Sequence, residues 1–323
     1  MSFFQPSLPT ELKFERSIKG TTIHPLLNSL LAIMAVFRDG LAPGWIDSER
    51  TDLLGGCWLT CLRGWGRSVT TPATQGLTGP SSVVLSDIHS FVTGIHSSIQ
   101  KHVAESVKVL GQNSPPPIFL MGHSMGGAEV LYYMLNSPLF PTWIRGVLAY
   151  SPLIVLHPSS RPWNLTVRMG RLAAKVRPHH QLHKPLDPNL VCRDKRVCEE
   201  WKEDPLCHDT GTLEGMAGML DRGEWLDALR SSSDTERSTD TALWVCHGDA
   251  DQINSFEASQ LFTQAVGVRN KTFKSYEGGF HKLHAEPNGM KEAFAKDVAE
   301  WILGQCDREH HHGDGEGPGK PRL

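Results

Sequence analysis

One stretch, residues 115–135, constrains the fold of this chain more than any other. It reads PPPIFLMGHSMGGAEVLYYML: three prolines, a short apolar run, a glycine-rich turn and a run of strong helix formers. Prolines cannot continue a helix, and the short apolar run suits a strand buried in a parallel sheet. The turn has the pattern G-x-S-x-G, with Ser124 between Gly122 and Gly126. The stretch therefore predicts a strand, a tight turn at Ser124 and a helix.

A serine in such a turn is placed to act as a nucleophile. The turn is strained, and glycines two positions before and after the serine avoid the clash that a Cβ atom would cause. The strain lifts the Ser124 hydroxyl clear of the sheet, and the backbone N–H of Met125, at the start of the helix, can face a developing oxyanion. We therefore predict Ser124 as the nucleophile and the Met125 N–H as one oxyanion donor.

Two downstream segments place an acid and a histidine at the same edge of the predicted sheet. Residues 242–246 form an apolar run that suits a strand, and the polar turn H-G-D-A-D after it ends at Asp251. Residues 271–276 alternate as a strand does, and the loop after them ends at His281. Parallel strands end at one edge of a sheet, and the chemistry of open α/β sheets lies at that edge. We therefore expect both side chains to lie near Ser124.

Four motifs stand in a fixed order along the chain. They are R-G-W-G-R-S at residues 63–68, G-H-S-M-G-G at 122–127, H-G-D-A-D at 247–251 and Y-E-G-G-F-H at 276–281. Together they resemble the monoacylglycerol lipase family of serine hydrolases, whose related sequence class is often labelled serine aminopeptidase-like. The resemblance covers residues 62–303. It implies an α/β-hydrolase fold, with a mostly parallel central sheet, helices on both faces and a helical cap inserted over the acyl pocket.

The resemblance also implies roles for single residues. It indicates a triad of Ser124, Asp251 and His281, in the chain order that α/β-hydrolases use. His281 would take the proton from Ser124, and Asp251 would orient His281 and stabilise its imidazolium. Two alternatives stay open. Asp249, in the same turn, could be the acid, and His284, three residues after His281, could be the base.

The activity that the resemblance implies is hydrolysis of the ester bond of monoacylglycerols. The serine would form an acyl-enzyme, glycerol or another alcohol would leave, and water would release the fatty acid, with no metal or organic cofactor. Two other classes stay open. One is another carboxylesterase, lysophospholipase, thioesterase or peptidase, and the other is a lipid-binding relative that turns over poorly.

Residues 1–61 depart from the pattern of the resembling family. That family has two or three strands here, and one ends in a His-Gly pair whose N–H supplies a second oxyanion donor; here His24 precedes Pro25 instead. Residues 26–37 are apolar but too short to span a bilayer, which suits a core or interfacial helix. We expect an atypical segment that replaces the first strands and leaves the second donor unidentified. The abrupt return of the pattern at Arg63 favours a wrong reading frame or an unspliced intron over gradual divergence.

Composition divides the rest of the chain. After the strand that follows Ser124, the strand signal disappears and Pro-rich breaks separate amphipathic pieces, which predicts a cap; a helical insert without a role at the site is the alternative. A polar linker returns to the core, and the C-terminal end is glycine-rich, charged and poor in apolar residues, which predicts disorder. The predicted ranges are 62–154 and 241–304 for the α/β-hydrolase core, 155–230 for the cap or lid, 231–240 for the linker and 305–323 for the tail.

Charge and cysteine usage limit the partners. A net charge of −3 and an isoelectric point near 6.6 give no electrostatic reason to bind nucleic acid. Seven scattered cysteines, with no secretory signal at the N-terminus, predict reduced thiols in the cytoplasm. Cys57 and Cys61 lack a second pair of ligands, so no zinc site is predicted. The expected partner is a small-molecule lipid ester, with peripheral contact to a membrane or lipid droplet surface through the cap.

Overall fold

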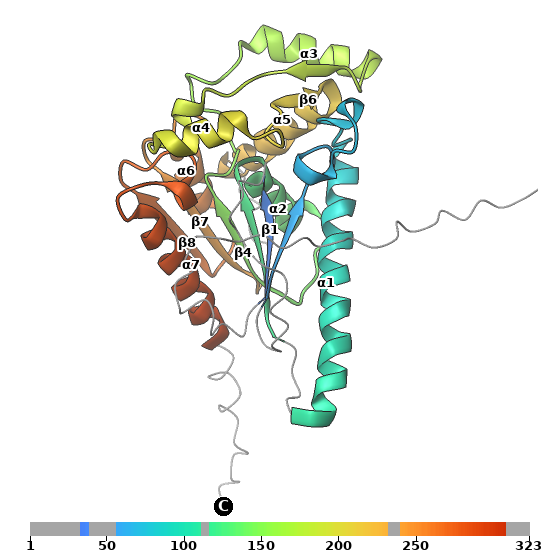
Figure 1. The fold of residues 1–323 in the computed structure, drawn as a ribbon, viewed down its shortest axis with the longest axis vertical. Coiled ribbons are helices and arrows are strands. Elements are labelled where there is room, and N and C mark those ends of the chain that lie inside the picture. The colour runs from blue at the N-terminus through green and yellow to red at the C-terminus, as the bar shows by residue number, and fades with distance from the viewer. Residues whose placement is uncertain (1–32, 39–55, 111–115, 232–239, 308–323) are drawn as a thin grey trace, which may run out of the picture.

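A parallel β-sheet organises the computed structural model, which describes residues 33–38, 56–110, 116–231 and 240–307 (Figure 1). Within these residues six strands form the sheet, in the order β2-β1-β3-β4-β7-β8, and every neighbouring pair is parallel. The strands are β1 (Ile33–Arg38), β2 (Gly56–Cys61), β3 (Ile118–His123), β4 (Ile144–Tyr150), β7 (Ala242–Gly248) and β8 (Lys271–Tyr276). The predicted parallel sheet is confirmed.

Alternation along the central strands supplies two apolar cores, one on each face of the sheet. In β3, Leu120 belongs to one core while Phe119 and Met121 belong to the other, and β4 and β7 alternate in the same way. Successive side chains of a strand point to opposite faces, so a strand covered on both sides reads as a continuous apolar run. This is why the apolar run before Ser124 forms a buried strand.

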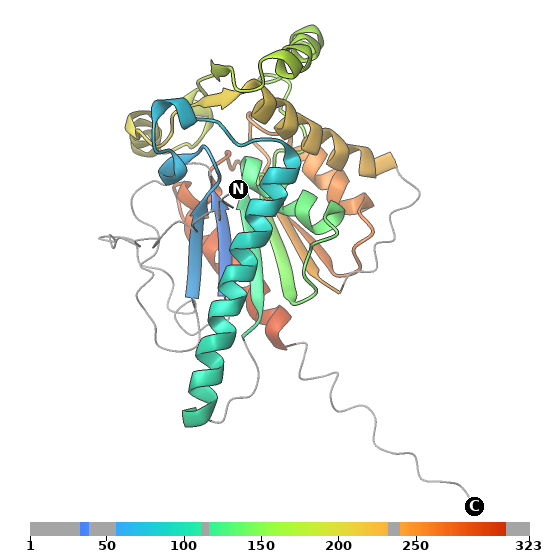
Figure 2. The same cartoon turned by 90° about the vertical axis from the view of Figure 1, so that its right-hand side faces the viewer.

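Helices cover both faces, as expected from the sequence. The larger core includes side chains of α1, α2 and α6, and the smaller core includes side chains of α7. Figure 1 shows α1 and α7 on opposite sides of the sheet, and Figure 2 shows α1 running along its face. The four helices are α1 (Ser81–Leu110), α2 (Ser124–Asn136), α6 (Phe256–Ala265) and α7 (Met290–Asp307).

An insertion between β4 and β7 lies beyond the carboxyl ends of the strands, at the top of Figure 1. Its described residues contain three helices and, in addition to the helices that the sequence predicted, a short antiparallel pair of strands. Its elements are α3 (Asn164–Val176), β5 (Gln181–His183), α4 (Lys195–Glu203), β6 (Thr210–Thr212) and α5 (Leu213–Ala228). Short 3-10 turns are η2 (Gly66–Ser68), η3 (Pro72–Thr74), η4 (Pro188–Leu190), η5 (Leu229–Ser231) and η6 (Leu283–Ala285).

The N-terminal segment contains strands where none were expected. A helix was predicted over residues 26–37, but residues 33–38 form the strand β1, so the prediction is wrong there. Residues 1–61 were expected to replace the first strands of the family, and the presence of β1 and β2 shows that this expectation is wrong for these two segments. A short apolar run does not distinguish a helix from a strand by periodicity. β3 needs a neighbour on this side, because an unpaired central strand would leave its backbone N–H and C=O groups without partners.

The other expectations for residues 1–61, including the one about His24, concern residues outside the described part of the chain. The reading-frame hypothesis stays a prediction, as do the linker over residues 232–239 and the disordered tail from residue 308. Residues 305–307, however, belong to α7 and not to the tail. The Gln305 carbonyl accepts hydrogen bonds from the Arg145 guanidinium at 3.0 and 3.1 Å, which ties the last turn of the helix to β4. Among the described residues, no helix combines the length and apolar character needed to cross a bilayer.

The place of β1 in the sheet gives a first testable prediction. Ala35 lies opposite Trp58 of β2 and Leu120 of β3, so the strand is paired on both sides. Ala35→Pro removes a backbone N–H from the ladder and should lower the free energy of unfolding by about 3 kcal/mol or more. Urea denaturation measures the loss. Ala35→Gly keeps the N–H and should cost only about 0.5–1 kcal/mol; equal small losses for both variants would contradict the pairing.

Candidate active site

The backbone at Ser124 is strained, as the motif predicted. β3 ends at His123 and α2 begins at Ser124, whose φ of 52° lies in the left-handed region. Non-glycine residues rarely adopt this region, because the Cβ atom crowds the backbone. A Cβ atom on Gly122 would lie 2.2 Å from the carbonyl oxygen of Gly126, so the turn requires glycine there.

A chain of hydrogen bonds joins the three residues that the sequence singled out. The Nε2 atom of His281 lies 2.9 Å from the Ser124 Oγ, and its Nδ1 atom lies 2.7 Å from the Asp251 Oδ2. A carboxylate only accepts, so Nδ1 carries the hydrogen and Nε2 is left to accept from the serine hydroxyl. The three residues follow β3, β7 and β8 and meet at the carboxyl edge of the sheet.

Asp251 is buried and ionised. Burial raises the pKa of this carboxyl, but the charge of His281 and hydrogen bonds from His247 and His281 outweigh that effect and hold the pKa well below its ordinary value. The backbone N–H groups of Ile253 and Asn254 also donate to Oδ1, at 2.7 and 3.0 Å. Donors on both oxygens keep the negative charge beside His281.

The two alternative residues lie elsewhere. Asp249 is exposed, and its Oδ1 accepts a hydrogen bond of 2.6 Å from the backbone N–H of Gly278. His284 is buried, and its ring packs edge-on against the rings of His123 and Tyr150. The structure therefore brings Asp251 and His281 to Ser124. Asp249 and His284 instead contact neighbouring loops and rings.

Three further polar side chains support the site and were not singled out from the sequence. His247 is buried and joins the Asp251 Oδ2 to the hydroxyl of Ser259, at 2.9 and 2.8 Å. The Asn254 amide donates to the carbonyl of Ser151 at 2.8 Å and lies 3.4 Å from the Ser124 Oγ. His123 donates from Nε2 to the carbonyl of His281 at 3.1 Å. His247 and His123 lie within the recognised motifs, but the motifs do not show which residues these two side chains contact.

The Met125 N–H, predicted as an oxyanion donor, lies in the first turn of α2. Met125 is the second residue of α2, and the first N–H groups of a helix have no partner within it. β1 runs beside β3, with Phe37 opposite Gly122, so the chain leaves β1 next to the Ser124 turn. Residues 39–55 follow and lie outside the described residues, and no second donor is assigned.

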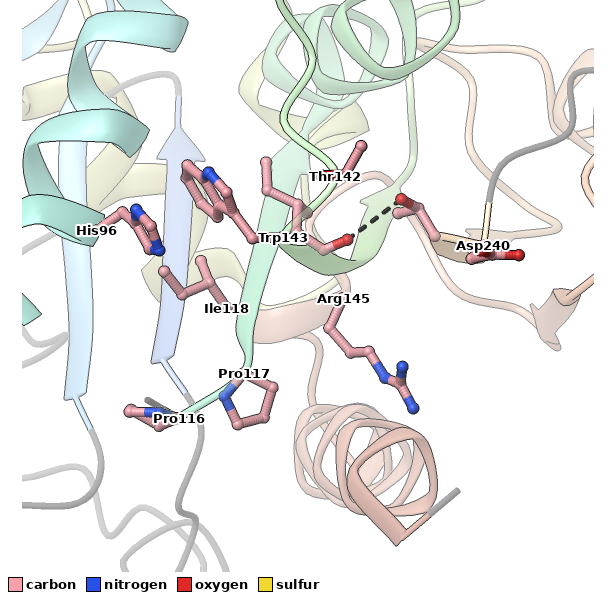
Figure 3. Close-up of a pocket in the computed structure, with 10 residues that line it drawn as sticks. His96, Pro116, Pro117, Ile118, Thr142, Trp143, Arg145 and Asp240 are labelled. Atoms are coloured by element: carbon pink, nitrogen blue, oxygen red, sulfur yellow. Dashed lines mark hydrogen bonds between the residues drawn. The ribbon is translucent and has the colours of Figure 1, made fainter. Parts of the chain in front are cut away.

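Two cavities lie at opposite edges of the sheet. A small one beside the site is lined largely by apolar side chains, among them Trp65, Met125, Met216 and Met219. A cavity of about 240 Å³ lies at the amino ends of β3, β4 and β7, where the ring of His96 stacks on that of Trp143 (Figure 3). The first is bordered by Met125, the residue after Ser124. Within the described residues no group of three or more His, Cys, Asp or Glu side chains is placed to hold a metal ion.

The buried carboxylate gives a prediction about pH and stability. Because the folded-state pKa of Asp251 is lowered, its contribution to stability is complete above the ordinary aspartate pKa of about 3.9 and is lost as pH falls below it. Asp251→Asn should therefore lower the free energy of unfolding at pH 5 by about 2 kcal/mol. The difference from the parent protein should shrink between about pH 4 and pH 2.

Urea denaturation as a function of pH measures both effects. Asp249→Asn, at an exposed position in the same turn, is the matched control and should stay within about 0.5 kcal/mol of the parent at every pH. A difference for Asp251→Asn that is absent at pH 5, or unchanged down to pH 2, would contradict the ionised carboxylate.

Several known proteins with similar sequences are named monoglyceride lipases. A Schizosaccharomyces pombe relative is 28% identical over 241 residues, which are 74% of this chain and 58% of that protein. The monoglyceride lipase of Mus musculus is 28% identical over 221 residues, 68% of this chain and 67% of the mouse protein. The chain thus spans less than two thirds of the first relative.

Solved structures show the same fold. A soluble variant of monoglyceride lipase from Saccharomyces cerevisiae, bound to a substrate analog, superimposes with a TM-score of 0.65 at 22% identity, covering 85% of this chain and 86% of that one. The monoacylglycerol lipase of Paleococcus ferrophilus gives 0.62 at 23% identity, covering 85% and 94%. The predicted α/β-hydrolase fold is confirmed. The family model described as serine aminopeptidase, S33, matches residues 59–288, and the chain therefore belongs to this family of α/β-hydrolases.

Proposed function

We propose that this protein is a serine hydrolase that cleaves the ester bond of monoacylglycerols through an acyl-enzyme on Ser124. The observation that carries the proposal is the hydrogen-bond chain from Ser124 through His281 to the buried, ionised Asp251. A nucleophile, a base and an orienting acid in hydrogen-bond contact are what acyl transfer requires. The relatives named monoglyceride lipase support the substrate class.

The reaction follows from the proton positions. His281 accepts the Ser124 hydroxyl proton at Nε2 as the oxygen attacks the ester carbonyl, and Asp251 stabilises the imidazolium through Nδ1–H. The Met125 N–H donates to the oxyanion that forms. His281 then gives the proton to the departing glycerol oxygen. In the second half the same base takes a proton from water, and the fatty acid leaves.

The walls next to the nucleophile favour an apolar acyl group. Trp65, Met216 and Met219 line the small cavity that Met125 also borders. Methionine side chains are flexible and fit chains of varied shape. This lining supports a lipid ester over a peptide. Another carboxylesterase, lysophospholipase or thioesterase would use the same machinery, and the substrate panel below separates these activities.

A second candidate is a lipid-binding relative with slow turnover. Only one oxyanion donor is assigned among the described residues, and losing one such donor typically costs roughly 10²–10³ in turnover. Such a protein would still bind a lipid and would still have an activated serine. Its turnover would be roughly 10²–10³-fold slower than that of an enzyme with a complete oxyanion hole.

We also propose that the cap meets a lipid surface through α3. Leu165, Met169, Leu172 and Val176 are 57–77% exposed, and their spacing of three and four residues places them on one stripe of the helix. Trp163, just before the helix, is 84% exposed. An amphipathic helix with such a stripe lies in the interface of a membrane or a lipid droplet.

The opposite side of α3 is fixed to α5 of the same insertion. Arg171 makes ion pairs of 2.7 and 2.8 Å with Asp221 and Glu224 of α5. Figure 2 shows α3 at the outer end of the molecule, farther from the sheet than α5. The apolar stripe is therefore turned away from the protein, and the exposed Arg168 and Lys175 add attraction to anionic head groups.

The nucleophile is tested by Ser124→Ala. Because nothing else in the site can form the acyl-enzyme, hydrolysis should fall by roughly 10⁶-fold and labelling by a fluorophosphonate probe should disappear. Ser86→Ala, on the exposed side of α1, is the control and should keep both. Near-normal turnover by Ser124→Ala would refute the assignment.

The substrate class is tested with a panel of monoacylglycerols, lysophospholipids, acyl thioesters and peptides, measured on the parent protein. We expect the highest kcat/KM for a monoacylglycerol. A preference for a thioester or lysophospholipid would replace the proposed substrate and keep the mechanism. Labelling by the probe without turnover of any member would favour the lipid-binding relative.

The lipid-surface proposal is tested by Leu165→Gln/Met169→Gln/Leu172→Gln. A fully buried apolar side chain contributes about 1.5–3 kcal/mol to binding. Replacing three partly inserted side chains should therefore weaken binding to phosphatidylglycerol-containing vesicles by roughly 10²-fold or more. Turnover of a short soluble ester should not change. Thr166→Ala, on the same helix, is the control; equal vesicle binding by the triple variant and the control would refute docking through α3.

A further inference from the structure

Two buried glutamates occupy equivalent places relative to two residues of the proposed triad. Glu129 stands five positions after Ser124, in α2, and Glu286 stands five positions after His281, just after η6. Both side chains are completely buried. A buried carboxylate needs a partner, and in each case that partner is an arginine of the insertion between β4 and β7.

The first pair joins the histidine loop to the segment before α4. The backbone N–H of Arg193 donates to Glu286 Oε1 at 2.9 Å, and its guanidinium Nε donates to Oε2 at 2.5 Å. Both carboxylate oxygens are therefore held by one cap residue. Such a two-point contact fixes direction as well as distance.

Other contacts tie the same loop to the same part of the cap. The backbone N–H of Lys282, the residue after His281, donates to the carbonyl of Val191 at 2.9 Å. The Lys282 side chain is 3% exposed, and its ammonium lies 4.9 Å from the ring centre of Trp201 in α4. The thiol of Cys192 donates to the carbonyl of Ala285 at 3.3 Å. Cap residues between 191 and 201 thus hold the histidine loop at several points.

The second pair joins the nucleophile helix to α5. The Arg222 guanidinium donates to Glu129 Oε1 at 2.9 Å and to the hydroxyl of Ser81, at the start of α1, at 3.1 Å. Arg222 is 2% exposed, so the whole contact is removed from water. The contact holds three helices together directly behind the Ser124 turn.

These pairs differ from the exposed ion pair in the same insertion. Arg196 and Glu200 of α4 are 72% and 49% exposed, and water screens such pairs. Both glutamates are fully buried, while the Arg222 and Arg193 side chains are 2% and 31% exposed. Removing either arginine would leave a buried carboxylate without its compensating charge. The cap therefore contacts the two reacting elements through the buried carboxylates of Glu129 and Glu286.

We propose that Arg193 and Arg222 are positioning residues, through which the cap holds the His281 loop and the Ser124 helix at reacting distance. This inference rests on the proposed function. It divides the insertion into two parts: α4, α5 and the segment before α4 belong to the catalytic frame, while α3 serves the lipid surface. Turnover should depend on the two arginines whatever the length of the acyl chain.

The experiment compares Arg193→Met and Arg222→Met in the full-length protein with a short soluble ester, p-nitrophenyl butyrate, and with a long-chain monoacylglycerol. Displacement of reacting groups by about 1 Å can cost roughly 10²-fold, so kcat should fall by roughly that factor for both substrates while KM changes little. Arg196→Met, at the exposed pair, should match the parent. Parent-like kcat in both variants, with both folded, would overturn the inference.

A second variant separates positioning from stability. Arg222→Met/Glu129→Met removes the buried charges together and leaves an apolar pair, which typically restores stability. We expect a melting temperature near that of the parent with kcat still lowered. Recovery of both quantities would show that the single variant failed only because of an unpaired charge, and would overturn the role of Arg222. Arg193→Lys keeps the charge and the backbone N–H bond to Glu286 Oε1, but it replaces the fixed guanidinium Nε donor to Oε2 with a flexible ammonium. It should give an intermediate kcat; a parent-like value would overturn the role of Arg193.

A readout without turnover keeps this inference distinct from the proposed function. Absence of hydrolysis and of probe labelling in the parent protein would refute the proposed function only. In that case the imidazole proton of the His281–Asp251 hydrogen bond, observed by NMR, decides the inference. Its loss in Arg193→Met and retention in Arg196→Met would support the positioning role, and its retention in both would overturn it.

Discussion

A single buried carboxylate sets the geometry of the site. Asp251 accepts hydrogen bonds from two imidazoles and two backbone N–H groups, so its negative charge is stabilised where water is excluded. That charge determines which nitrogen of His281 carries the hydrogen, and the remaining nitrogen faces Ser124. The strained turn at Ser124 and the loops after β7 and β8 serve this arrangement. The parallel sheet makes it possible, because all three segments leave strands at one edge.

Local chemistry explains what could be predicted from the sequence. The G-x-S-x-G turn, the H-G-D-A-D turn and the histidine after a strand each depend on residues close together in the chain, and the structure brings Ser124, Asp251 and His281 together. β1 was missed because a short apolar run has no periodicity that separates a strand from a helix. Contacts between distant residues, such as Arg193 with Glu286 or His123 with the carbonyl of His281, leave no local pattern. The cap was expected as a cover, and its attachment to the site could not be read from composition.

The insertion therefore has two physical characters. Around Glu129 and Glu286 it is buried, charged and paired, and it packs on the elements that carry the reacting groups. Along α3 it is apolar and exposed on one side, and Arg171 pairs with Asp221 and Glu224 of α5 on the other. In the proposed docking through α3, the part that meets the mobile lipid surface is separate from the part that holds atoms within hydrogen-bond distance.

The position of β1 also has a consequence for how the molecule is made. β1 comes early in the chain but lies between β2 and β3, and its pairing with β3 joins residues that are far apart in sequence, with α1 between them. Such non-local parallel pairing is slow, because the loop must close before the contact forms. During synthesis the edge of β1 that later meets β3 has no partner until β3 has left the ribosome, and an unpaired edge is where chains aggregate. The β1 edge therefore stays exposed during synthesis until β3 follows it out of the ribosome.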